Sequence, residues 1–329
     1  MKRYFVVLLV VCMASTIFAA GSAQGSDSKA KTSSGYPNRP IEIIVPVDAG
    51  TGTDRTCRAI APTLEKHLGV PVNVINDGAA GGDVATVRLA KSTRADGYTW
   101  GFWNLVEMAS RSSLGNLKGV VDMLQDFVYA GGTYVDNHVI VVKKDGPFKT
   151  LDDIVRVARA NPGTVTWGRP ARISIDTTYI NFMERTYNIK FNIIEGSGDA
   201  VGMTAIMGGH LDIMNDNVSV SAQRYLDGAI GIVGVGGDQR FPLIPDIPTY
   251  NEQGFNFPIQ GSERHFWGPA AMDKETLGFF RDALRKAAND PEYIERCKQM
   301  NLRHYYAEPS VSVERMRRFL DAYQKEEFY

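Results

Sequence analysis

The chain has 329 residues, of which 44% are hydrophobic and 22% charged, and its formal net charge is -1. This length is sufficient for two domains of ordinary size. The balanced charge excludes the strongly basic surface that binding to nucleic acid or to an anionic membrane would require. We therefore expect a soluble, globular protein without a nucleic-acid partner.

The N-terminus has the pattern of a secretory signal peptide. Two basic residues, Lys2 and Arg3, precede an apolar run, and small residues follow it up to Ala23. We predict a signal peptide over residues 1–23, and a disordered leader over residues 24–35, where no apolar residue is larger than alanine. The mature protein is thus expected in the periplasm.

Three cysteines bear on anchoring and cross-linking. Cys12 lies in the apolar run, but Val11 before it is not the small residue that a lipid-attachment site requires, so we expect no lipid anchor. Cys57 and Cys297 remain after processing, and an oxidising compartment would permit them to pair. Both lie in helical patterns, so simple burial is the alternative, and the sequence does not decide between the two.

The stretch from Ile41 to Asp54 predicts a strand followed by a glycine loop. The β-branched residues of Ile41–Val45 favour a buried strand, and Pro46 ends it because proline cannot donate to a sheet ladder. Gly50 and Gly52 then supply the backbone freedom for a tight loop. The loop leads directly into a helical pattern.

That helix is expected to be capped by Thr53 or Asp54 and to stop at Gly69, with Pro62 either kinking or shortening it. Strand, loop and helix N-terminus together suit an anion, because unpaired backbone N–H groups and the positive end of the helix dipole converge there. The pattern is not specific, since Arg55 replaces the third glycine of a dinucleotide fingerprint. An ordinary strand-to-helix turn without a ligand is an equally good interpretation.

The next segments repeat this order. Val70–Ile75 reads as a second strand, and the small residues of Asn76–Asp83 form a second loop, in which Asp83 can cap a helix to about Lys91. Tyr98–Trp103 is a third strand. Such a β-α-β-α-β order predicts a doubly wound, mostly parallel sheet, in which ligands lie at the carboxyl ends of the strands. Both glycine loops would fall at that edge.

The middle of the chain predicts a second α/β lobe. A capping box at Thr150–Asp153 opens a helix, and a further helix is expected over residues 175–187. A short helix ends near Met207. Short apolar runs predict strands at residues 139–142, 165–168, 191–194, 211–214 and 229–235.

The last third begins with an irregular crossing between Pro242 and Pro269. Three helices follow, over residues 273–288, 290–301 and from 310 to the end. A C-terminal return of this kind is typical of two-lobed binding proteins. We predict that residues 36–134 and 236–329 form lobe 1 and residues 135–235 form lobe 2, with crossings near Val135 and Val235.

The residues favour a binding protein over an enzyme, and we expect no cofactor or metal. Asp48, Asp54 and Asp83 could be imagined as an acid/base or metal cluster, but helix capping explains Asp54 and Asp83 without chemistry. The five histidines have no spacing fit for zinc, and no Gly-x-Ser-x-Gly elbow is present.

Nine sequence blocks resemble one family. In order they are Y-P-N-R-P-I-E-I-I-V-P, D-A-G-T-G-T-D, V-I-N-D-G-A-A-G-G, A-D-G-Y-T, P-F-K-T-L-D-D-I, N-P-G-T-V-T-W-G, G-G-H-L-D-I-M, I-P-D-I-P-T-Y-N-E-Q-G-F and F-W-G. From Tyr36 to the C-terminus the chain resembles the solute-binding receptors of tripartite tricarboxylate transporters, the Bug family. The resemblance implies a type II periplasmic binding fold, with two lobes that clasp a small carboxylate.

The resemblance also implies binding residues, a partner and alternatives. Backbone amides of two first-lobe loops would hold the carboxylate, here Asp48, Ala49, Gly50, Thr51, Gly52, Thr53 and Asp54 with Ala79, Ala80, Gly81 and Gly82. On the second lobe the expected contacts are Arg169, Ser174, Ser197 and Asp216, and Trp167 and Trp267 either line the cleft or belong to the core. A monomer would deliver the ligand to membrane permease subunits. A receptor that signals to a sensor kinase is the alternative, and a secreted enzyme acting on a small carboxylate is a remote one.

Three departures from the usual family pattern leave the ligand's identity open. Asp48 replaces a neutral residue, Thr51 interrupts the glycine run, and Arg169 stands where small hydroxyl residues are common. Asp48 would repel a second acidic group and suits an ammonium, amide or hydroxyl donor. Arg169 would pair with a distal carboxylate or with Asp48. A monocarboxylate or amino-bearing acid is then favoured over a tricarboxylate, unless both side chains point to solvent.

Overall fold

The computed structural model describes residues 32–170, 174–197, 199–300, 302 and 304–324. In chain order its elements are β1 (Ile41–Val45), α1 (Gly52–Leu68), β2 (Val72–Asn76), the 3-10 turn η1 (Ala79–Gly82), α2 (Asp83–Lys91), β3 (Thr99–Asn104), α3 (Leu105–Ser113), β4 (Phe127–Val142), α4 (Leu151–Ala160), β5 (Thr166–Arg169), α5 (Ile175–Tyr187), β6 (Asn192–Glu195), α6 (Asp199–Gly208), β7 (Ile213–Asn217), α7 (Val218–Leu226), β8 (Gly231–Val235), β9 (Gly261–Pro269), α8 (Lys274–Ala288), α9 (Pro291–Gln299) and α10 (Pro309–Gln324). The predicted α/β class is confirmed.

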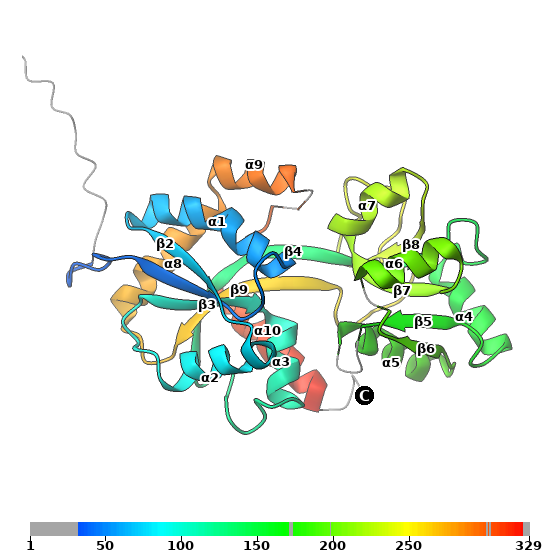
Figure 1. Ribbon diagram of the computed structural model, residues 1–329, viewed down its shortest axis with the longest axis horizontal. Coiled ribbons are helices and arrows are strands. Elements are labelled where there is room, and N and C mark those ends of the chain that lie inside the picture. Colours follow the sequence, from blue (N-terminus) through cyan, green and yellow to red (C-terminus); the bar gives the residue numbers. More distant parts are fainter. Residues whose placement is uncertain (1–31, 171–173, 198, 301, 303, 325–329) are drawn as a thin grey trace, which may run out of the picture. The chain divides into compact units, whose positions relative to one another are not determined.

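The strands form two groups that share β4. They pair in the order β2-β1-β3-β9-β4-β7-β5-β6, and β8 also pairs with β4. Strands β1, β2 and β3 are parallel, as are β5, β6 and β7, whereas β4 and β9 run antiparallel to their neighbours. Figure 1 shows the two groups joined by β4 and β9. Each group thus has parallel strands, and in a doubly wound sheet ligands bind at the loops that follow the carboxyl ends of such strands.

Two long strands are longer than the sequence indicated. β4 spans 16 residues, of which only 139–142 were expected, and β9 occupies Gly261–Pro269, where an irregular crossing was predicted. The first part of β4 pairs with β9, and its last residues pair with β7 and β8. The prediction of an irregular segment was wrong at β9 because Pro269 only ends the strand, where proline is tolerated.

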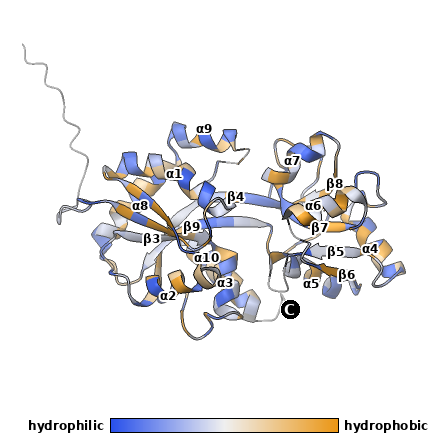
Figure 2. Cartoon of the chain, in the orientation of Figure 1, coloured by the Kyte–Doolittle hydropathy of each residue, from blue (hydrophilic) through white to orange (hydrophobic). Residues whose placement is uncertain are grey.

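Helices cover both faces of each strand group. In the first group, one core lies under α1, α8 and α9, and another under α2, α3 and α10. In the second group, one core lies under α4 and α5 and the other under α6 and α7. Most helices in Figure 2 carry both hydrophilic and hydrophobic bands, as amphipathic helices do. The cores thus hold the ends of the parallel strands in fixed positions.

The segment between β8 and β9 packs with the second strand group. Phe241 and Ile247 belong to the core under α6 and α7, and Tyr250 and Phe257 belong to the core under α4 and α5. The division into lobes at residues 134/135 and 235/236 stays a prediction. We propose that its second crossing lies in β9, near Gly261, instead of near Val235.

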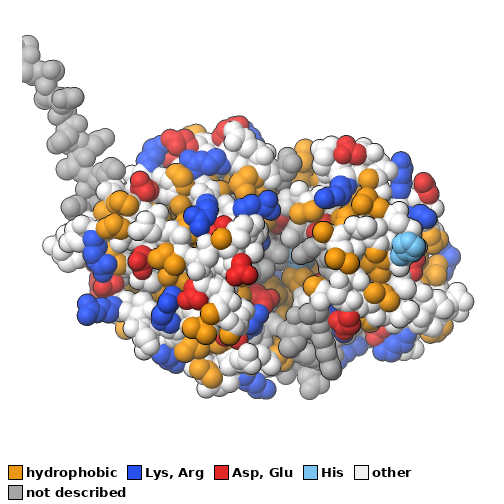
Figure 3. Space-filling model, viewed as in Figure 1, with side chains coloured by type: hydrophobic (Ala, Val, Ile, Leu, Met, Phe, Trp, Pro, Cys, Tyr) orange, Lys and Arg blue, Asp and Glu red, His pale blue; other side chains and the backbone are white. Residues whose placement is uncertain are grey.

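Several local expectations can now be compared with the structure. The capping box at Thr150 and Asp153 is present, and α1 continues through Pro62 to Leu68, where left-handed Gly69 ends it. Helices α3 and α7 were not predicted. The thiols of Cys57 and Cys297 are buried and free. Acidic and basic side chains are interspersed on the face seen in Figure 3, consistent with the balanced charge.

Candidate functional site

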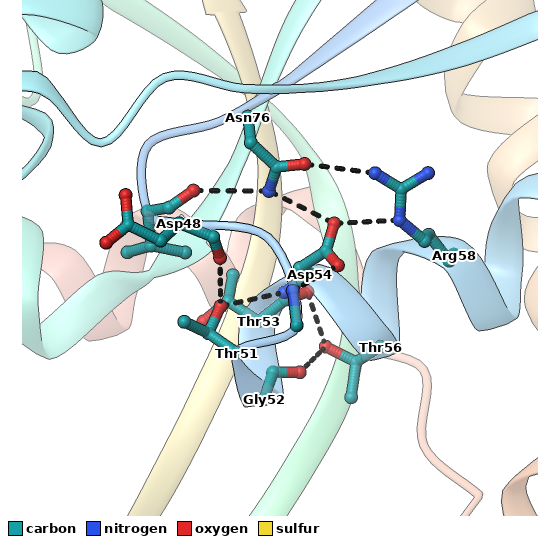
Figure 4. A network of polar contacts seen from close by, with 10 residues as sticks. Asp48, Thr51, Gly52, Thr53, Asp54, Thr56, Arg58 and Asn76 are labelled. Atoms are coloured by element: carbon teal, nitrogen blue, oxygen red, sulfur yellow. Dashed lines mark hydrogen bonds and ion pairs between the residues drawn. The ribbon is translucent and has the colours of Figure 1, made fainter.

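The first glycine loop is closed by Thr51, which is the N-cap of α1. Its hydroxyl accepts from the backbone N–H of Asp54 at 3.4 Å and donates to the carbonyl of Asp48 at 2.9 Å (Figure 4). The prediction that Thr53 or Asp54 caps this helix was therefore wrong by two or three residues, because Thr51 adopts the extended backbone of a cap. Thr51, which interrupts the glycine run of the family pattern, is thus the residue that caps α1.

Asp54 holds the loop together from inside. It is 3% exposed, and its carboxylate accepts from Gly50 N at 2.8 Å, Arg58 Nε at 2.9 Å and Asn76 Nδ2 at 3.0 Å. Burial alone would raise the pKa of Asp54, but these hydrogen bonds outweigh it and lower the pKa below its ordinary value. The carboxylate of Asp54 thus binds the protein's own groups and stabilises the loop.

The second loop presses against the first. Ala80, Gly81 and Gly82 all have positive φ, of 51°, 67° and 94°. A Cβ on Gly82 would lie 2.4 Å from the carbonyl oxygen of Pro46, and one on Gly78 would lie 2.6 Å from a carboxylate oxygen of Asp48. Only glycine permits this approach. The structure therefore brings the two predicted first-lobe loops together.

Asp83 does not cap α2, contrary to the prediction. The N-cap is Gly82, and the carboxylate of Asp83 accepts from Arg111 Nη1 and Asn116 Nδ2, both at 3.0 Å. Because these two partners come from α3 and the loop after it, Asp83 ties the second loop to a neighbouring helix. Asp48 differs from both other aspartates: it is exposed, and its carboxylate forms no hydrogen bond or ion pair with the described residues.

Three of the four predicted second-lobe residues lie together at the ends of β5 and β6. Arg169 donates to Glu195 Oε1 at 3.1 Å and to Thr177 Oγ1 at 3.1 Å, and Thr177 lies 3.5 Å from the hydroxyl of Ser174. Ser197 donates its backbone N–H to the Arg169 carbonyl. Arg169 is thus paired with Glu195 and not with Asp48. The nearby Arg172 lies outside the described residues.

The fourth predicted residue, Asp216, is engaged by Ser221, whose hydroxyl donates to it at 2.6 Å. Its neighbour Asn215 was missed. Asn215 is 8% exposed, and neither its side-chain nitrogen nor its side-chain oxygen has a hydrogen-bond partner among the residues that the structure describes. Buried polar groups are nearly always paired, so an unpaired amide at the end of a parallel strand marks a place for a ligand or water.

Arg264 was also missed. It lies on β9, is 7% exposed, and donates from Nε to Thr53 Oγ1 at 3.0 Å. One sequence signal could have revealed it: Arg264 lies two residues before the aromatic pair Phe266 and Trp267, in a segment expected to be irregular. This contact places a guanidinium at the N-terminus of α1.

The remaining candidates belong to the interior. Trp167 and Trp267 are fully buried core residues. His138 lies between Tyr179 and Ser262, and burial lowers its pKa to about 3. The described part of the chain contains no cluster of three His, Cys, Asp or Glu residues that could hold a metal ion.

Comparison with known proteins decides the family. Residues 56–325 match the tripartite tricarboxylate transporter family receptor. The chain belongs to this family. A relative from Cupriavidus necator, "UPF0065 protein in gbd 5'region", is 28% identical over 307 residues, which cover 93% of this chain and 90% of the relative.

Solved structures support the two-lobed periplasmic-binding fold of this receptor. A TctC solute-binding protein from Polaromonas superposes with a TM-score of 0.78 at 23% identity, covering 88% of this chain and 98% of that one. MatC from Rhodopseudomonas palustris, solved with bound malate, gives 0.69 at 19% identity, covering 88% and 99%. The matched family is thus one of transporter receptors, and the Polaromonas neighbour is a solute-binding protein.

Localisation rests on the family. Among the residues that the structure describes, no helix has the length and apolar content needed to cross a membrane. The predicted signal peptide, residues 1–23, lies outside the described residues, as does the leader up to residue 31. Both therefore stay predictions.

Proposed function

We propose that this receptor captures a small carboxylate between its two lobes and delivers it to the membrane permease subunits of a tripartite transporter. The observation that carries the proposal is the start of α1. Gly52 and Thr53 are its first two residues, and N–H groups in the first turn of a helix have no acceptor within the helix. With the helix dipole they favour a negative group.

The loops around this point support a fixed, preorganised site. Asp54 and Thr51 already satisfy the polar groups that shape the first loop, and the glycines of η1 bring the second loop against it. A site formed in advance loses less entropy when the ligand binds. Ala49, Gly50 and Ala79 remain proposed contacts on the rim of these loops.

The charged side chains around the start of α1 favour a ligand with one carboxylate and a hydrogen-bond donor. Asp48 is exposed beside Gly78 and has no cationic partner in the described part of the chain, whereas Arg169 is engaged by Glu195. An ammonium, amide or hydroxyl near Asp48 would gain a charge-assisted hydrogen bond, and a second carboxylate there would be repelled. We infer a monocarboxylate, hydroxy acid or amino acid in preference to a tricarboxylate.

Calorimetry on the mature protein with a panel of mono-, di-, tri- and aminocarboxylates tests the proposal. We expect binding to the one-carboxylate members, compaction in small-angle scattering on binding, and no turnover of any ligand. Absence of binding across the panel would contradict the function. Genes for permease subunits beside this one, as opposed to a sensor kinase, would identify the partner.

Two matched cap variants locate the site. Thr51 and Thr150 are both threonine N-caps, of α1 and α4, so replacing either by alanine should cost about 0.5–2 kcal/mol of stability. Only Thr51→Ala should weaken ligand binding, because only α1 presents its N-terminus to the ligand. Equal affinities for the two variants would place the site elsewhere.

A further inference from the structure

Arg264 is a buried cation whose direct contacts among the described residues are with neutral groups. Nε donates to Thr53 Oγ1 at 3.0 Å, Nη1 donates to Thr56 Oγ1 at 3.4 Å, and the guanidinium carbon lies 3.9 Å above the ring of Tyr134. Within the part of the chain that the structure describes, Arg264 forms no ion pair, and Nη2 donates no hydrogen bond. Arg264 is the only arginine among the described residues that is buried, whereas the half-buried Arg315 is paired with Glu263.

Asp136 is a buried acid that interacts with Arg264 through space, without a direct contact. Asp136 accepts from the hydroxyl of Tyr134 at 2.8 Å and from the backbone N–H and hydroxyl of Ser219 at the start of α7. Its oxygens are thus used by neutral donors, and it forms no ion pair with Arg264. An arginine side chain does not lose its proton in proteins, and a buried charge is costly unless an opposite charge accompanies it. Among the described residues, the guanidinium of Arg264 therefore has no carboxylate within ion-pair distance, and the buried Asp136 acts on it only through space.

The geometry directs this charge to the start of α1. Gly52 is the first residue of α1, and a Cβ built on it would lie 3.2 Å from Nη2 of Arg264. The one guanidinium nitrogen without an acceptor thus lies next to the helix N–H groups that also lack one. The helix dipole adds to the positive potential at the same point. Guanidinium and backbone N–H groups together match the two oxygens of a carboxylate.

We propose that Arg264 binds the ligand's carboxylate directly, and that Gly52 is needed to leave room for that contact. The inference rests on the proposed function and deepens it: the site requires an ionised carboxylate, and a neutral amide in its place would leave the guanidinium uncompensated. Arg264 is then the residue that distinguishes an acid from its amide. Asp48, which is exposed, would contact a different part of the ligand, its hydrogen-bond donor.

The test compares Arg264→Met and Arg264→Lys with Arg281→Met. Arg281 is a half-buried arginine of α8 that donates to the Tyr129 carbonyl, so its variant controls for the loss of a shielded cation. Calorimetry would use the tightest carboxylate of the panel and the same compound with that carboxylate converted to an amide. We expect wild type and Arg281→Met to prefer the acid at least tenfold. Arg264→Met should lose that preference, and Arg264→Lys should keep part of it.

Unfolding in the absence of ligand separates binding from folding. Because Arg264→Met removes a buried charge without a counter-ion, its unfolding midpoint should equal or exceed that of wild type. If this variant does not fold, Gly52→Ala provides the second route, since alanine is a good helix residue but its Cβ crowds Nη2. We expect Gly52→Ala to fold normally and to bind the acid several-fold more weakly.

The outcomes distinguish the two claims. If wild type binds a carboxylate while Arg264→Met and Gly52→Ala keep the same affinity and the same preference for acid over amide, the inference is overturned and the proposed function stands. If wild type binds no member of the panel, both are overturned.

Discussion

Asp48 lies on the first glycine loop and Asp54, six residues later, in the first turn of α1, and their surroundings give them different roles. Asp54 is buried and bound by three donors, whereas Asp48 is exposed and its carboxylate has no partner among the described residues. Residue type alone did not separate them, because the difference lies in which side chain faces Asn76 and Arg58. We therefore expect the replacement of Asp54 to lower stability and the replacement of Asp48 to change ligand affinity.

Asp54→Asn should destabilise the protein. The change removes the charge from three hydrogen bonds and turns one acceptor into a donor that faces the N–H of Gly50 or the guanidinium of Arg58. Hydrogen bonds to charged groups contribute about 1.5–3 kcal/mol, so we expect a loss of about that size in urea unfolding. Asp48→Asn, on the loop that precedes α1, is the control and should leave the free energy of unfolding unchanged. Equal stabilities would contradict the assigned role of Asp54.

Asp48→Ala should change ligand preference instead. If its carboxylate meets an ammonium group, the variant should bind the aminocarboxylate about tenfold more weakly, which corresponds to about 1.4 kcal/mol. Affinity for the same acid without the amino group should be unchanged or higher. Calorimetry with the matched pair measures both, and unchanged affinity for both ligands would show that Asp48 only contacts solvent.

The elements nearest the candidate site could be predicted well because their signals are local. Pro46 and Gly69 bound the first strand and helix, and small residues mark the second loop. Asn215 and Arg264 could not be found this way, because each matters through contacts, or unmet contacts, with residues distant in sequence. Strand β9 was hidden by prolines and glycines that usually indicate a loop.

The glycines of β4 show why such residues can occur inside a strand. A Cβ on Gly132 would lie 2.5 Å from the ring of His265, its partner on β9, which is fully buried and bound to Ser312 at 2.7 Å. The imidazole occupies the space of a side chain. Glycine at this position thus follows from cross-strand packing and not from a turn.

Gly132→Ala should destabilise the pairing of β4 with β9. The new methyl group would push His265 from its contact with Ser312, and overpacking of this kind typically costs about 1–3 kcal/mol. Gly278→Ala, on α8 with open space around the new Cβ, is the matched control and should be neutral or stabilising. Chemical unfolding of both variants measures the difference. A Gly132→Ala protein as stable as wild type would show that the imidazole moves without cost.

For the whole molecule, β4 is the element common to both strand groups. Its residues up to Asn137 pair with β9, and those from His138 onward pair with β7 and β8. His138 stands at this change of partner, between the hydroxyls of Tyr179 on α5 and Ser262 on β9 at 3.1 and 3.0 Å. A charge placed on His138 would therefore disturb both groups together.

The buried position of His138 makes the free energy of unfolding depend on pH. Burial, with a smaller effect from Arg264, lowers the pKa of His138 to about 3. In the unfolded chain it is about 6.5. Between these values the unfolded chain binds a proton that the folded protein does not, so stability is full above pH 6.5 and falls as the pH is lowered. The slope is about 1.4 kcal/mol per pH unit, or about 2 kcal/mol between pH 6.5 and 5.

Other buried groups modify the slope. Burial also lowers the pKa of His265, which adds a loss of the same sign, whereas burial raises the pKa of Asp136, whose contribution falls as the pH rises. Urea unfolding at pH 7, 6 and 5 should therefore show a shallower pH dependence for His138→Gln than for wild type. His210→Gln, at an exposed histidine, controls for the loss of one imidazole. If His138→Gln kept the full wild-type slope, the proton linkage would have to lie in another group, because glutamine cannot take up the proton that the unfolded wild-type chain binds.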